Sequence, residues 1–150
     1  MTDVQTAFSG AHTTIGDTFD VFVYQDDDSD PSNGATLVGA YPGQLIAAPQ
    51  DMLQTIVLST PLTLTGSGDI LVALVCRGPS QFPASVDNGL PGDSQRSWIG
   101  PNGAPVGASP DLTQLGMQRV DHLLPGFNFN GIIRARATNA SGPIVFGGPK

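Results

Sequence analysis

The chain contains no glutamate and only one lysine, Lys150, at its last position. Both residue types are strong helix formers, whereas aspartate, which supplies all 13 acidic side chains, is a poor one. This composition argues against helical bundles and coiled coils. Basic residues number only six, and the formal net charge is -7. Because phosphate binding needs clustered lysine or arginine, the sequence predicts no nucleic-acid partner.

Other residue types and motifs that are scarce in the sequence exclude further classes of protein. The single cysteine, Cys76, excludes an intrachain disulfide, and its place in the apolar run ILVALVC predicts a buried hydrophobe. No apolar run approaches the length of a membrane span, so we expect no membrane insertion. The two histidines, His12 and His122, show no zinc-ligand spacing. Nucleophile, phosphate-loop and dinucleotide motifs are also absent, which predicts that the chain is not an enzyme.

Glycine and proline, in contrast, make up about a fifth of the chain and divide it into short segments. Between these breaks, apolar and polar residues alternate with the period of a half-buried strand, as in residues 19–24 and 127–138. The most apolar run, residues 70–76, predicts a central strand buried on both faces. Residues 112–124 form the best helix candidate, which Gly116 weakens.

These segments predict an all-β fold. We expect a two-sheet antiparallel β-sandwich of jelly-roll or related Greek-key topology, with a long loop-rich segment at residues 78–110. One domain is expected over residues 1–138. Residues 139–150, which are rich in glycine and proline, are expected to form a C-terminal tail or linker.

Four aspartates lie close together in the segment DDDSDPSNG, which begins at Asp26. Asp26, Asp28 and Asp30 alternate, and Asn33 follows them, which is typical of a calcium loop because Ca²⁺ prefers carboxylate and carbonyl oxygens. The segment is not an EF-hand, since its twelfth position is Leu37 rather than glutamate. The alternative is a solvated hairpin turn whose charge hinders edge pairing. Both a calcium site at these four residues and a plain turn stay open.

Trp98, the only tryptophan, lies in the loop-rich segment close to Arg96. A flat aromatic face matches the C–H face of a pyranose sugar, so these two residues are candidate contacts for a carbohydrate or another partner. The alternatives are that Trp98 packs in the core or a lid, and that Arg96 forms an ion pair with one of the many aspartates.

Four segments carry a resemblance, and they follow one another in the right order. They are residues 19–41, which contain FDVFVY and the acidic turn, residues 58–74 (LSTPLTLTGSGDILVAL), residues 82–100 with Arg-Ser-Trp, and residues 127–138 (FNFNGIIRARAT). Together they resemble β-sandwich accessory modules of secreted multi-domain bacterial proteins. The resemblance implies a module without a catalytic set, in an extracellular or cell-surface setting, although no signal peptide is visible in the first residues.

Such modules usually open with a further strand before the counterpart of residues 4–8. Without that strand, a sheet edge is left open to a strand of another chain. We therefore expect a structural or self-assembly role through edge-strand pairing, which would give a homo-oligomer or filament. The alternatives are a calcium-dependent carbohydrate-binding module and a viral or phage jelly-roll structural protein.

Overall fold

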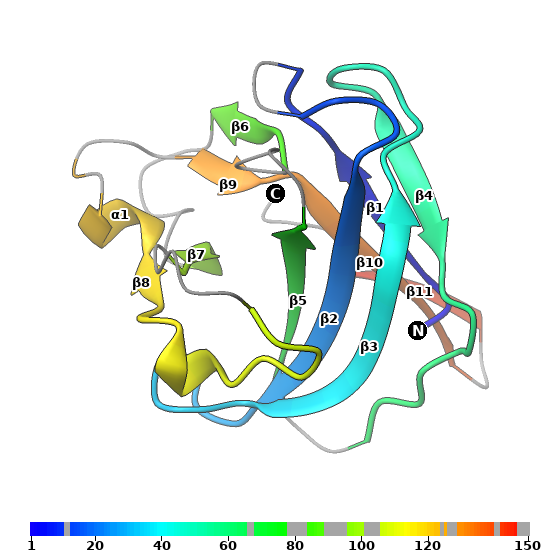
Figure 1. Ribbon diagram of the computed structural model, residues 1–150. Helices are drawn as coiled ribbons and strands as arrows, with labels where there is room; N and C mark the ends of the chain where they lie inside the picture. Colours follow the sequence, from blue (N-terminus) through cyan, green and yellow to red (C-terminus); the bar gives the residue numbers. More distant parts are fainter. Residues whose placement is uncertain are drawn as a thin grey trace.

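In the computed structural model, the regular secondary structure consists mainly of antiparallel strands, with little helix (Figure 1). It describes residues 1–10, 13–65, 68–77, 84–88, 96–100, 106–123, 125, 129–139 and 142–146. The strands are β1 (Asp3–Ala7), β2 (Thr18–Asp26), β3 (Thr36–Leu45), β4 (Leu53–Val57), β5 (Asp69–Cys76), β6 (Val86–Asn88), β7 (Trp98–Ile99), β8 (Gln118–Arg119), β9 (Phe129–Gly131), β10 (Ile133–Asn139) and β11 (Gly142–Phe146). The all-β prediction is confirmed.

The strands form two larger sheets and two small ones. One larger sheet has the order β11-β10-β1-β4 and the other the order β3-β2-β5, while β6 pairs with β9 and β7 pairs with β8. Every one of these pairs is antiparallel. Figure 1 shows β2, β3 and β5 in front of β1, β10 and β11.

The core is centred on β2, which is buried on both faces. Phe19, Val21 and Val23 share one face of this strand and pack in one cluster with side chains of the other larger sheet, including Val4 and Ile56. Phe22, Tyr24 and Leu112 form a second cluster on the opposite face. Each fully buried side chain of this kind contributes about 1.5–3 kcal/mol of transfer free energy. β2 therefore contributes to a core cluster on each of its two faces.

The prediction that residues 70–76 form a central strand is wrong in its position. This segment is β5, which lies at the end of the order β3-β2-β5 and is half-buried along its whole length. Its alternate side chains pack on different clusters, Val72 and Leu74 on the first and Leu71 and Ala73 on the second. The apolar residues on both faces of β5 are thus explained by the packing of each face against a core cluster, and not by a paired strand on each side of β5.

The predicted helix at residues 112–124 is also wrong, apart from its two ends. A 3₁₀ turn at Leu112–Gln114 and the one-turn helix α1 (Val120–Leu123) flank β8, and Leu124 lies outside the described residues. Gly116 separates them with a φ of 61°, a left-handed conformation that a continuous helix cannot contain. The predicted helix is therefore interrupted at Gly116, the residue that weakened the helix prediction.

The described parts of the loop-rich segment hold β6 and β7, while residues 78–83, 89–95 and 101–105 lie outside the description. At the C-terminal end, β11 pairs with β10 at Ala135–Asn139. Residues 142–146, expected to belong to a tail or linker, thus continue the sheet. The rest of that tail, residues 140–141 and 147–150, is not described.

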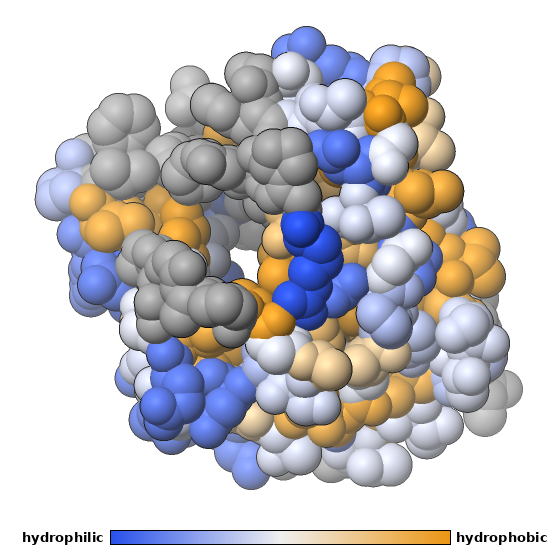
Figure 2. Space-filling model, viewed as in Figure 1, coloured by the Kyte–Doolittle hydropathy of each residue, from blue (hydrophilic) through white to orange (hydrophobic). Residues whose placement is uncertain are grey.

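The outer edge of β4 carries exposed apolar side chains. Val57 is 74% exposed and Leu53 48% exposed, and Leu45 and Met52 nearby are also exposed. Figure 2 shows apolar side chains along the right-hand margin of the molecule, where β4 lies in Figure 1. β4 pairs with β1 on one side, and among the described residues no strand pairs with its other side. This edge is free of charged residues.

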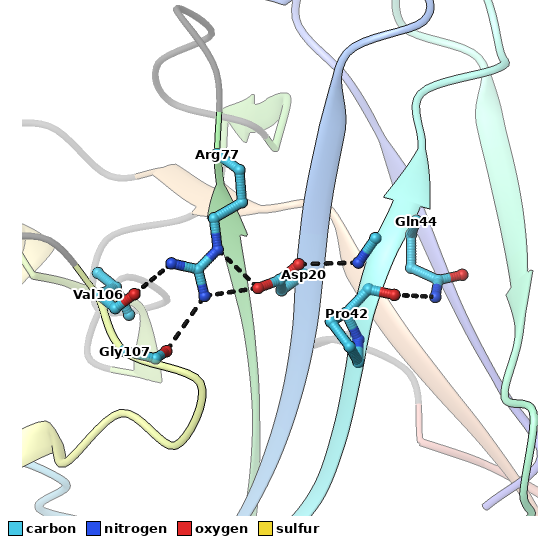
Figure 3. A network of polar contacts seen from close by, with 7 residues as sticks. Asp20, Pro42, Gln44, Arg77, Val106 and Gly107 are labelled. Carbon is cyan, nitrogen blue, oxygen red and sulfur yellow. Dashed lines mark hydrogen bonds and ion pairs between the residues drawn. The ribbon is translucent and has the colours of Figure 1, made fainter.

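A polar network ties the end of β5 to its surroundings (Figure 3). Buried Asp20 on β2 accepts hydrogen bonds from the backbone N–H of Gly43 at 2.9 Å and from Nε of Arg77 at 2.6 Å. The guanidinium of Arg77 also donates to the carbonyls of Val106 and Gly107. Asp20 thereby connects β2, β3 and the segment that leads into the 3₁₀ turn.

Candidate functional site

The acidic turn, residues 26–34, follows β2 and is held by its own side chains. Asp28 Oδ1 accepts from the N–H of Asp30 at 3.0 Å, and Asp28 Oδ2 accepts from the amide of Asn33 at 2.7 Å. Asp30 Oδ1 accepts in turn from the N–H and the hydroxyl of Ser32. Aspartate side chains that bond to an N–H two residues further on stabilise a turn locally.

The carboxylates of this turn have opposite electrostatic environments. Asp26 is only 4% exposed at the end of β2, and burial together with the charge of Asp28 raises its pKa above the ordinary value. The hydrogen bonds from Asn33 and from the N–H of Asp30 lower the pKa of Asp28. The pKa values of these two neighbouring carboxyls are therefore shifted in opposite directions from the ordinary value.

The calcium prediction for Asp26, Asp28, Asp30 and Asn33 concerns the side chains of this turn. Within the described part of the chain, no group of three or more His, Cys or Asp side chains is placed to hold a metal ion. The oxygens of Asp28 and Asp30 point to turn amides and hydroxyls. These contacts favour the plain turn, and calcium binding stays a prediction.

Asp69, at the start of β5, connects the acidic turn with Arg96. Its carboxylate accepts from the hydroxyl of Ser29 at 2.5 Å and forms an ion pair with Arg96. The Ser29 hydrogen bond and the Arg96 charge both lower the pKa of Asp69. In the β2–β5 ladder Asp69 lies opposite Asp26. The expected ion pair of Arg96 with an aspartate is thus present, and it lies beside the turn.

Trp98 lies in β7, where it is half-buried and pairs with Arg119 of β8. The β7–β8 pair faces the acidic turn across a pocket of about 490 Å³. The side chains that line it are Ser29, Asp30, Ser32, Trp98, Met117, Gln118, Arg119 and His122. Two regions that the sequence singled out separately, the acidic turn and Trp98, therefore meet around one pocket.

The charge of Arg119 is held within the wall of this pocket. Its Nε donates to Oδ1 of Asp121 at 3.0 Å, and the second nitrogen donates to Oδ2 of the same carboxylate. This bidentate pair lowers the pKa of Asp121 and raises that of Arg119. Asp121 is thus held by Arg119, while the neighbouring residue His122 lines the pocket. His12 lies outside the described residues.

Among the predicted site residues, Asp30 and Trp98 line the pocket, and Arg96 reaches the turn through Asp69. Asp26, Asp28 and Asn33 do not line it. The sequence missed Arg119 and Met117, because both enter the wall through the pairing of β7 with β8, two strands of two residues each. Short strands leave no alternation from which such a pairing could be predicted.

The remaining candidate, Cys76, behaves as a packing residue. It is half-buried at the end of β5, and burial, with a smaller contribution from the charge of Asp17, raises the pKa of its thiol to about 11. A thiol of this kind is a poor nucleophile at neutral pH. Among the described residues, none of the helices has the length and hydropathy needed to cross a membrane.

Comparisons with protein-family models, with curated proteins and with solved structures gave no match. No family is therefore identified for the chain, and the resemblance to accessory modules of secreted bacterial proteins stays a prediction. Function has to be argued from the geometry of the described residues.

Proposed function

We propose that the chain is a non-catalytic structural module that assembles with copies of itself through the outer edge of β4. The observation that carries this proposal is the uncharged strand Leu53–Val57, which has exposed apolar side chains and one side free of strand partners among the described residues. Edge strands in monomeric proteins are normally blunted by lysine, proline or bulges. β3 has such features, with Pro42 and two register shifts, and β4 has none of them.

The sequence of β4 is self-complementary about Thr55. In an antiparallel pair centred on this residue, Leu53 lies opposite Val57 of the second copy, and Thr55 lies opposite its own equivalent. The N–H of Leu58, directly after β4, donates to the carbonyl of Thr2, directly before β1, so residues of even number in β4 direct their backbone groups to β1. Leu53, Thr55 and Val57 direct theirs to the free side, where this register would pair them. A two-fold dimer satisfies both requirements.

The interface expected from this pairing is small. Two five-residue strands bury less area than a standard protein–protein interface, even with the exposed side chains of Leu45, Met52 and Ile15 nearby. We therefore expect dissociation constants between micromolar and millimolar, and assembly that depends on concentration. Local concentration at a surface or in a tandem array would strengthen it.

We infer that the two larger sheets pack face to face as the layers of a β-sandwich. The support is the shared core cluster, to which Val4, Ile56 and Ala135 contribute from one sheet and Phe19 and Val21 from the other. In such a sandwich β4 lies at a corner, where its outer edge is accessible. The extracellular setting and the viral or phage alternative stay predictions from the sequence.

Analytical ultracentrifugation over micromolar to millimolar concentration tests the assembly. The wild-type chain is expected to form dimers, and Val57→Lys is expected to weaken dimerisation at least tenfold, because lysine on an edge strand opposes pairing. Val86→Lys is the matched control, since Val86 is a 53% exposed valine on β6. Thr55→Cys is expected to form a disulfide-linked dimer under mild oxidation, whereas Val86→Cys is not.

A monomer at every concentration would overturn the proposal. Equal weakening by Val57→Lys and Val86→Lys would also overturn it, because the effect would then not belong to β4. Circular dichroism of each variant identifies any loss of fold, and the Thr55→Cys result reads the register independently of the charge variants.

A further inference from the structure

The pocket beside the acidic turn is the candidate small-molecule site in the described part of the chain. Its volume of about 490 Å³ falls in the range of ligand pockets, and its wall combines one aromatic ring with several polar side chains. Ser29, Asp30 and Ser32 come from the acidic turn, Trp98 from β7 and Arg119 from β8. These segments are distant in sequence, so the fold is what brings this set together.

The charged groups of the wall are already paired, which determines the charge of a suitable ligand. Arg119 donates two hydrogen bonds to Asp121, and Asp30 Oδ1 accepts two from Ser32. An anion would meet a guanidinium whose charge Asp121 already balances, and a cation would meet a carboxylate oxygen that already accepts two hydrogen bonds. The wall therefore favours a neutral ligand.

The remaining groups favour a ligand with hydroxyls on its rim and an apolar face. The amide of Gln118 and the imidazole of His122 each combine donor and acceptor capacity, and the hydroxyl of Ser32, whose hydrogen bonds to Asp30, can accept. The Trp98 ring and Met117 supply the apolar part of the wall. A pyranose ring has this combination, since its hydroxyls lie around the rim and its C–H groups form a flat apolar face.

We propose that the pocket between Trp98 and the acidic turn binds a neutral pyranose sugar without a metal ion. Metal independence is expected because the residues that line the pocket include a single aspartate, Asp30, whose Oδ1 already accepts two hydrogen bonds. The site is separate from the assembly edge, because no residue of β4 lines the pocket. A monomeric chain would bind the sugar equally well.

Intrinsic fluorescence provides a local readout, because Trp98 is the only tryptophan of the chain. The probes are cellobiose, lactose and the disaccharide of N-acetylglucosamine, with glucuronic acid and glucosamine as charged counterparts. Each is titrated once with calcium and once with EDTA. At least one neutral disaccharide is expected to give a saturable change of the same size in both buffers, and the charged sugars are expected to bind more weakly.

Gln118→Ala removes one hydrogen-bonding side chain of the wall and is expected to weaken binding about five- to tenfold, as the loss of one hydrogen bond does. Gln44→Ala on β3 is the matched control, because Gln44 bonds to Pro42 and does not line the pocket. Thermal melting confirms that both variants fold. The proposal is overturned if no neutral sugar changes the fluorescence, if both glutamine variants lose binding equally, or if glucuronic acid binds tightest. Loss of binding in EDTA overturns its metal independence.

Discussion

Asp20→Ala removes the acceptor at the centre of the network in Figure 3. Asp20 is 5% exposed and accepts from the N–H of Gly43 and from two nitrogens of Arg77 at 2.6 Å. The substitution leaves the Gly43 N–H without this acceptor and the guanidinium without its counter-charge. Breaking a buried pair from one side costs about 3–5 kcal/mol. The Arg77 side chain is 31% exposed and keeps its carbonyl partners, so we expect the lower end, about 3 kcal/mol.

For a domain of this size, about 3 kcal/mol corresponds to a fall in Tm of roughly 6–12 °C. Urea unfolding followed by circular dichroism at pH 7 measures the free energy directly. Asp27→Ala is the matched control, since Asp27 is an exposed aspartate that directly follows β2. The double variant with Arg77→Ala measures the coupling, which is expected to be at least about 1 kcal/mol. A cost no larger than that of Asp27→Ala, or a coupling near zero, would refute the reasoning.

Three further predictions concern the acidic turn and β5. Burial raises the pKa of Asp26, so the contribution of this residue to stability is complete below pH 3.8 and is lost as the pH rises through the folded pKa. The variant Asp26→Asn is therefore expected to gain stability relative to wild type from pH 4 to 7. The pKa of Asp28 is lowered, so the stability of Asp28→Asn relative to wild type is expected to change with pH in the opposite direction. Urea unfolding at several pH values measures both variants, and stability differences that change with pH in the same direction would contradict this assignment. Gly68→Ala is expected to cost about 1–2 kcal/mol more than Gly16→Ala in thermal melting, because both have positive φ but only at Gly68 would a Cβ lie 2.6 Å from a backbone oxygen. With a thiol pKa of about 11, only about one Cys76 in a thousand is ionised at pH 8, so iodoacetamide is expected to modify the folded chain slowly and the urea-unfolded chain fast; equal rates would contradict this.

Strands could be predicted from the sequence because their signal is local. Residues 19–24 and 70–76 alternate or run apolar over their own length, and they form β2 and β5. Their positions in the sheet could not be predicted in this way. β2 contains Asp20 and is nonetheless the central strand, because Gly43 and Arg77 satisfy that carboxylate. Hydrophobicity predicts a central place in the sheet for residues 70–76, whereas the place of a strand depends on whether its polar groups find hydrogen-bond partners.

For the candidate site, too, local features could be predicted from the sequence, whereas contacts between distant segments could not. The acidic turn and Trp98 each have a composition that attracts attention, and both could be identified before the fold was known. Their meeting depends on the register that places Trp98 opposite Arg119, in strands of only two residues. Nothing in the residues around position 98 or 119 determines that register. The pocket is therefore a property of the fold rather than of any motif.

Part of the use of aspartate has a physical reason that the composition alone does not reveal. At three places a carboxylate accepts the N–H two residues further on: Asp28 from Asp30, Asp30 from Ser32, and Asp111 from Thr113. The aspartate side chain is short enough to close such a turn on its own backbone. Glutamate is one methylene longer and is not among the residues that favour this local bond. The charges of Asp28 and Asp30, two of the four in the acidic turn, then follow from their use as local hydrogen-bond acceptors.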